Sequence, residues 1–267
     1  FFRTTPFDDP FAENFFQFLD DLKRKKNAKI GSVAILYENT NFGTGVAEVE
    51  VKHAGRYGYK VAATVAYAEK GTSAVSEVQK LKASGADVVM PASYTSDAIL
   101  YVKTFKDLNY APQGILAMDA GYISDEFKKT LGKDANFILS REVWALDLGK
   151  KKPMIAKVNE IYKKRFGRDM NGNSARSFTG FLVLADAINR AKSSEPEKIR
   201  EALENYTLSG DNMIMPWEGV SFDPNTHQNT KGRGIIVQLV DGEWHTVWPF
   251  ELASRDIVWP FPAWDKR

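Results

Sequence analysis

Short apolar runs alternate with helical patterns over the first half of this 267-residue chain. Apolar positions at helical spacing follow the first, second and third of these runs. Strands that are apolar on both faces are typical of a sheet covered by helices on both sides. The alternation therefore predicts a doubly wound parallel sheet, with all strand carboxyl ends at one edge. The expected strands are residues 33–37, 60–67, 87–90, 114–118 and 137–143.

The pattern changes after Gly149, where helices follow one another without an intervening strand. Apolar helices of this kind need a sheet to pack on, and this segment does not supply one. The helices are expected at residues 153–166, 174–191 and 197–206.

Two further elements are predicted near the carboxyl end. Residues 234–239 and 244–247 flank Asp241-Gly242, a pair that favours the tight turn of a β-hairpin. Residues 251–267 are rich in Trp and Pro and are expected to form an extended strap.

Composition excludes several classes of protein. The formal net charge is only +2, which gives no electrostatic footprint for nucleic acid. The absence of Cys excludes disulfides, thiolate nucleophiles and Cys-ligated zinc. No segment approaches the roughly 18 apolar residues of a membrane helix, and none has the form of a signal peptide. The chain begins with Phe1 and not Met, so we expect that a preceding segment has been removed or is missing.

A glycine-containing loop follows the first expected strand, and a helix is predicted from Gly45 to His53. A dinucleotide fingerprint would use Gly43 and Gly45 and would require a third glycine, but Glu48 stands at that position. The Gly-Lys-Ser/Thr of a phosphate-binding loop is also absent. The loop is therefore not expected to hold a phosphate.

Three side chains stand just beyond the carboxyl ends of expected strands: Phe42, Tyr94 and Asp119. Ligands of open α/β sheets bind at this edge. Two aromatic rings and one carboxylate suit a small cationic or amino-bearing ligand. Each residue alone also has a structural interpretation: loop packing for Phe42, a rim aromatic for Tyr94, and a helix cap for Asp119.

These segments, in this order, resemble the type I periplasmic solute-binding proteins of ABC transporters, in the branched-chain amino acid (leucine/isoleucine/valine-binding) branch. The resemblance covers essentially the whole chain. It is carried by "FFRTTPFDD", "VAILYENTNFGTG", "ADVVMPASYTSDA", "QGILAMDAGY" and "NSARSFTGFLVLADAI".

The resemblance implies two doubly wound parallel-sheet α/β lobes joined by hinge crossovers. The family begins with a further segment, which holds most of the first lobe's sheet and is absent here, so the first lobe is expected to be incomplete. Residues 4–143 and 232–250 would form ligand-binding lobe 2, residues 144–231 the helical part of lobe 1, and residues 251–267 the strap.

The resemblance also implies roles for four residues. Phe42, Tyr94 and Phe178 match aromatic positions that line the ligand cleft, and Asp119 matches an acidic position that pairs with the ligand's α-amino group. Leucine-type proteins carry Glu at this acidic position, so Asp119 is one methylene shorter. The family's donors for the ligand carboxylate lie in the missing segment.

The function implied is that of a periplasmic or extracytoplasmic solute-binding protein. It would deliver an amino acid or analogue to an ABC permease in the membrane, without catalysis, cofactor or metal. A ligand-sensing regulatory protein of the same fold is an alternative. An α/β enzyme is a further one, although His53, His227 and His245 stand in no recognised catalytic motif.

Overall fold

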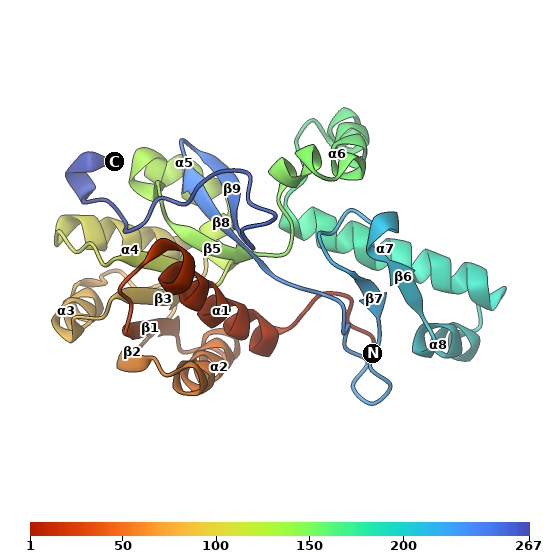
Figure 1. Ribbon diagram of the computed structural model, residues 1–267, viewed down its shortest axis with the longest axis horizontal. Coiled ribbons are helices and arrows are strands. Elements are labelled where there is room, and N and C mark those ends of the chain that lie inside the picture. The colour runs from red at the N-terminus through yellow and green to blue at the C-terminus, as the bar shows by residue number, and fades with distance from the viewer. The chain divides into compact units, whose positions relative to one another are not determined.

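The computed structural model describes residues 1–267 and divides the chain into two compact units (Figure 1). Unit 1 comprises Phe1–Pro10 and Glu142–Ile235, and unit 2 comprises Phe11–Arg141 and Ile236–Arg267. Residues 4–10 thus lie in unit 1, although the sequence analysis grouped them with the large sheet. The expected strap lies in unit 2.

A seven-stranded sheet forms the centre of unit 2, in the order β2-β1-β3-β4-β5-β8-β9. The pairs β1·β2, β1·β3, β3·β4 and β4·β5 are all parallel, as the sequence predicts. The strands are β1 (Ser32–Glu38), β2 (Lys60–Tyr67), β3 (Val88–Ala92), β4 (Gly114–Ala117), β5 (Leu139–Glu142), β8 (Ile235–Val240) and β9 (Glu243–Trp248).

The antiparallel pair β8·β9 confirms the predicted hairpin. Its turn residues Asp241 and Gly242 have φ of 53° and 81°. Positive φ at both central positions is the geometry of a type I′ turn, and this is why an Asp-Gly pair suits it.

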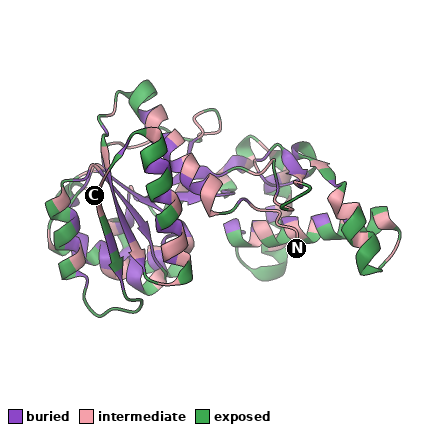
Figure 2. Cartoon of the chain, turned by 90° about the horizontal axis from the view of Figure 1, so that it is seen from below, coloured by how far each residue is buried: buried purple, intermediate pink, exposed green.

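Helices cover both faces of this sheet, as apolar strands require. Consecutive residues of a strand point to opposite faces of the sheet. Val33 and Ala34 of β1 are both fully buried, and so are Val88 and Val89 of β3. Figure 2 shows most of the sheet in the colour of buried residues. The helices are α1 (Asp8–Lys26), α2 (Asn41–Tyr57), α3 (Val75–Ser84), α4 (Thr95–Asp107) and α5 (Asp125–Leu131).

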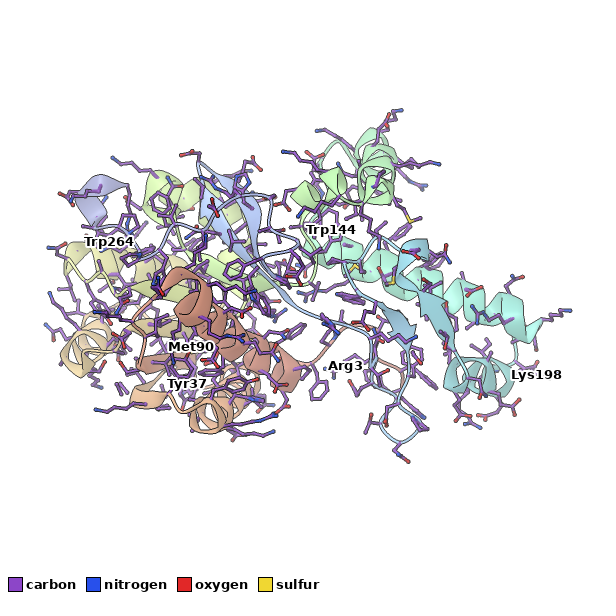
Figure 3. All side chains as sticks on the ribbon, in the orientation of Figure 1. Arg3, Tyr37, Met90, Trp144, Lys198 and Trp264 are labelled. Atoms are coloured by element: carbon purple, nitrogen blue, oxygen red, sulfur yellow. The ribbon has the colours of Figure 1, made fainter.

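Helix α2 begins at Asn41, four residues before the predicted start at Gly45. The predicted start was wrong because it assigned Gly43 to the loop, whereas Gly43 lies in the first turn of the helix. The strap after β9 is irregular apart from the short helix η5 (Trp264–Lys266). Trp264 anchors it, since its indole nitrogen donates to the carbonyl oxygen of Tyr110 at 2.9 Å (Figure 3).

Unit 1 consists mainly of helices α6 (Pro153–Phe166), α7 (Gly172–Ala191) and α8 (Pro196–Glu204). No strand interrupts them, as predicted. A small antiparallel sheet that the sequence analysis did not predict follows, from β6 (Thr207–Ser209) and β7 (Gly219–Ser221). Strands of three residues are too short to cover helices of 14 and 20 residues.

One face of α7 carries apolar side chains that remain exposed, which we call the α7 face. Phe181 is 72% exposed, more than any other residue of this face. Its members recur at intervals of three and four residues, which places them on one side of the helix. They are Phe178, Phe181, Leu184 and Ile188.

No helix of the chain combines the length and the apolarity needed to span a membrane.

Candidate ligand-binding site

Phe42 and Tyr94 come together at the carboxyl edge of the sheet in unit 2. Phe42 is the second residue of α2, and Tyr94 is the N-cap residue of α4. Their ring centroids lie 5.5 Å apart with an angle of 33° between the ring planes. Tyr94 is 48% exposed, so this aromatic pair is accessible to a small molecule. The sequence placed both residues at this edge, but not in contact.

Gly43 is required for packing, which explains the glycine in the loop after β1. A Cβ atom at this position would lie 2.1 Å from the carbonyl oxygen of Glu38, at the end of β1. A Cβ atom at Gly45 would meet nothing within 4 Å. The first glycine therefore brings α2 close to the strand and so positions Phe42.

Below the aromatic pair, the carboxyl group of Glu38 is fully buried. Thr40 donates a hydrogen bond of 2.6 Å to one carboxyl oxygen, and the other oxygen has no hydrogen-bond partner. Burial raises the pKa of Glu38, and the nearby Asp97 adds to this effect. The sequence analysis gave this residue no role.

The loop after β4 packs directly against Tyr94. A Cβ atom at Gly121 would lie 2.4 Å from the carbonyl carbon of Tyr94, and the Gly121 amide donates to Ser93 at 3.0 Å. Within the same loop, Asp119 and Ala120 have φ of 29° and 45°. Positive φ in non-glycine residues is strained and concentrates at ligand-binding sites. The aromatic pair and the Asp119 loop thus form one packed edge.

Asp119 is buried and forms an ion pair with Arg141 of β5, with 2.8 Å between a carboxylate oxygen and a guanidinium nitrogen. The Asp119 and Arg141 side chains are 9% and 3% exposed. The guanidinium carbon lies 3.6 Å from the ring centroid of Phe11, a cation–π distance. Two guanidinium nitrogens lie 3.3 and 3.4 Å from the sulfur of Met118. The charge of Asp119 is therefore balanced within unit 2.

Asp119 does not cap the helix that follows it. Its side chain makes no capping hydrogen bond to the short helix Ala120–Ile123. Ser124 caps α5 instead, because its hydroxyl accepts from the Phe127 amide at 3.1 Å. The structural alternative considered for Asp119 is thus wrong.

Phe178, the fourth predicted site residue, lies in α7 of unit 1 and belongs to the α7 face, with 39% exposure. Near the start of this helix, a guanidinium nitrogen of Arg176 lies 3.4 Å from a carboxylate oxygen of Glu142. A Cβ atom at Gly172 would lie 2.3 Å from that carboxylate, so the helix N-terminus abuts an anion. The structure thus brings three of the four predicted residues to one edge, while the fourth belongs to the other unit.

Three buried charged residues at this edge were not predicted from the sequence: Arg141, Glu142 and Glu38. The available signal was a charge within or at the end of an apolar strand, as in "ILSRE" for Arg141 and Glu142 and "AILYE" for Glu38. A buried charge requires a partner, but the partner's identity depends on the register of neighbouring strands. No group of three or more His, Cys, Asp or Glu side chains could hold a metal ion.

A sequence model of the periplasmic binding protein family matches residues 3–243, and the chain belongs to this family. The family's fold binds ligands and is not that of an enzyme. The chain is 28% identical, over 263 residues, to Leu/Ile/Val-binding protein homolog 7 of Brucella suis biovar 1. The match includes 94% of this chain and 65% of that protein, so the chain spans just under two thirds of the relative's length.

Solved structures share the fold at lower identity. A branched-chain amino acid ABC transporter protein from Silicibacter pomeroyi aligns with a TM-score of 0.83 and 16% identity, covering 98% of this chain and 69% of that one. A leucine-binding protein from Thermotoga maritima aligns with a TM-score of 0.76 and 18% identity, covering 91% and 66%. These structures confirm the type I periplasmic binding protein fold that the sequence predicts, and this chain covers about two thirds of the length of each.

Proposed function

We propose that the protein is an extracytoplasmic solute-binding protein of an ABC importer, which binds an amino acid or a related small molecule. The observation that carries this proposal is the packed edge of unit 2, where accessible Phe42 and Tyr94 rings stand beside the strained loop of Asp119. The names of the relatives above support an amino acid as the ligand.

Phe42 and Tyr94 would contact the apolar part and the ammonium group of the ligand, since aromatic faces attract cations. Asp119 would accept a charge-assisted hydrogen bond from the ammonium group, which is among the stronger kinds of hydrogen bond. Phe178 is proposed as a further ligand contact, from unit 1. The two compact units, Phe1–Pro10 with Glu142–Ile235 and Phe11–Arg141 with Ile236–Arg267, are proposed as the two functional lobes.

The proposed partner is an ABC permease, and the proposed location is the periplasm or an equivalent extracytoplasmic space. Both proposals rest on family membership. A purified permease complex that binds the liganded protein more tightly than the ligand-free protein would support this part.

The ligand is tested by mass spectrometry of small molecules released from the purified full-length protein on denaturation. We expect an α-amino acid, and calorimetric titration with that compound should then show a single saturable site. Tyr94→Ala should weaken binding at least tenfold. Tyr57→Ala is the matched control. Tyr57 is the last residue of α2, whereas Phe42 lies near the start of that helix, and Tyr57 donates a hydrogen bond to Glu13. Binding of no amino acid, or equal losses in both variants, would contradict the proposal.

A further inference from the structure

The buried ion pair between Asp119 and Arg141 determines the electrostatic field that a ligand meets at this edge. Asp119 and Arg141 lie 2.8 Å apart, nitrogen to oxygen, and both side chains are more than nine-tenths buried. Water therefore screens their charges poorly, and the pair presents no net charge to an approaching molecule. A ligand ammonium group that reaches Asp119 also meets the field of the guanidinium group.

The size of this effect follows from the inverse dependence of Coulomb energy on distance. An ammonium group in contact with the carboxylate, at about 3 Å, would lie on the order of 5 Å from the guanidinium group. Repulsion at the longer distance then offsets about half of the attraction or more. The carboxylate of a zwitterion is attracted by the same guanidinium group and so offsets this repulsion, whereas a cation without a second charged group gains little at this site.

The surroundings of Arg141 keep its positive charge in a fixed place. One side of the guanidinium group faces the Phe11 ring at 3.6 Å, and two of its nitrogens contact the Met118 sulfur. Arg remains charged under all physiological conditions, and its planar group stacks on aromatic rings, whereas Lys has neither the plane nor the fixed geometry. The guanidinium group therefore cannot easily move away when a ligand binds.

We propose that Arg141 is a specificity-determining residue that makes the Asp119 site electrically neutral and so favours a zwitterionic amino acid over a simple cationic amine. This inference rests on the proposed function, because it assumes that the ligand's ammonium group approaches Asp119. Arg141 acts through Asp119 and need not touch the ligand.

The test compares two probes that share one side chain and one ammonium group. L-Leucine is a zwitterion, and 3-methylbutylamine is the same molecule without its carboxylate. Their dissociation constants are measured by calorimetry on the full-length protein at neutral pH, and the ratio of the two is the readout. A loss of stability alone changes both constants together and leaves this ratio unchanged.

Arg141→Gln removes the charge and keeps a donor for Asp119, so we expect the ratio to shift toward the amine by about tenfold or more. Arg141→Met, with an unbranched stem over Phe11, is a second neutral variant in case the first does not fold. Arg141→Lys restores the charge and should bring the ratio back toward that of the wild type. Lys106→Met is the matched control, because it removes one positive charge from an exposed pair with Asp134 in the same unit.

The outcomes separate the two proposals. If the wild-type protein binds neither probe and releases another amino acid on denaturation, that amino acid and its decarboxylated amine replace the two probes. If it releases no amino acid, the assigned amino acid site is wrong, and the inference about Arg141 fails with it. If the wild type binds L-leucine and the neutral variants keep the wild-type ratio, only the role of Arg141 is overturned. A shift of the same size in Lys106→Met would also overturn it, since the effect would then be one of net charge.

Discussion

Phe105 in α4 of unit 2 is fully buried, whereas Phe181 in α7 of unit 1 is 72% exposed, although both lie on amphipathic helices. The helices of unit 2 pack on a seven-stranded sheet from the same chain, and those of unit 1 have only two strands of three residues. The same sequence pattern thus gives a complete core where strands are supplied and an exposed stripe where they are not.

The largest expected difference between the units comes from one substitution made in each. Phe105→Ala should lower the free energy of unfolding by about 3–5 kcal/mol, because it opens a cavity in a closed core. Phe181→Ala should change it by no more than about 0.5 kcal/mol in this chain, as is usual for surface positions.

Hydrogen exchange followed by mass spectrometry reads the two units separately and checks both values. Equal costs for both variants in residues 1–267 would contradict the contrast between the units.

Glycine substitutions are expected to have the next largest effects on stability, and they compare close packing in the two units. Gly43→Ala should destabilise unit 2 by about 1–3 kcal/mol, because the new methyl group meets the backbone carbonyl of Glu38. Gly172→Ala in unit 1 should cost less, because it meets the carboxylate of Glu142, which ends a flexible side chain. Gly45→Ala is the control and should stabilise α2 by up to about 1 kcal/mol.

Urea denaturation of the three variants provides the measurement. A Gly43→Ala protein as stable as Gly45→Ala would show that the edge of unit 2 is not as tightly packed as the distances indicate.

The smallest expected effects concern the free energy of unfolding as a function of pH. Its dependence on pH has opposite signs at Glu38 in unit 2 and at Asp169 in unit 1. The pKa of Glu38 is raised by burial, so its protonated form stabilises unit 2 at low pH. The contribution is fully present below about 4.3, the pKa of Glu in an unfolded chain. It is lost as the pH rises from there through the raised pKa of Glu38 in the folded protein. Hydrogen bonds from Asn159 and Lys163 lower the pKa of Asp169 in unit 1. Its contribution is present above about 3.9 and is lost as the pH falls through the lowered pKa.

Glu38→Gln should remove the first dependence and raise stability at neutral pH, and Asp169→Asn should remove the second. Stability measured by denaturation from acid to neutral pH distinguishes them. A Glu38→Gln protein whose pH dependence matches that of the wild type would contradict the assignment.

Much of the fold was predictable because local patterns determine it. Apolar periodicity and turn residues require no knowledge of distant contacts. They predict the parallel direction of the strands, the β8·β9 hairpin and the bounds of α6. The early start of α2 was not predictable in the same way, since Gly43 is needed for a close approach between helix and strand. Propensity alone assigns a glycine to the loop.

The positions of the candidate site residues were predictable from the sequence, but their interaction partners were not. Phe42, Tyr94 and Asp119 stand at strand ends, which the alternation of elements reveals. The ion pair of Asp119 with Arg141 depends on the register of β4 and β5, in which Ala117 pairs with Ser140, one residue before Met118 and Arg141. Register is a tertiary property, so the sequence showed only that a charge stood inside an apolar strand.

Calorimetric titration of Asp119→Asn in the full-length protein, with the amino acid identified from the wild type, tests the central claim most directly. The substitution keeps the size of the side chain and removes its charge, but it also leaves the buried guanidinium group of Arg141 without its counter-charge, so the stability of the variant is measured beside its affinity. Loss of one partner from a buried charged pair typically costs about 2–5 kcal/mol, which corresponds to a more than tenfold weaker dissociation constant. The account predicts that loss, with the Phe42 and Tyr94 edge still folded. Wild-type affinity in Asp119→Asn would contradict it.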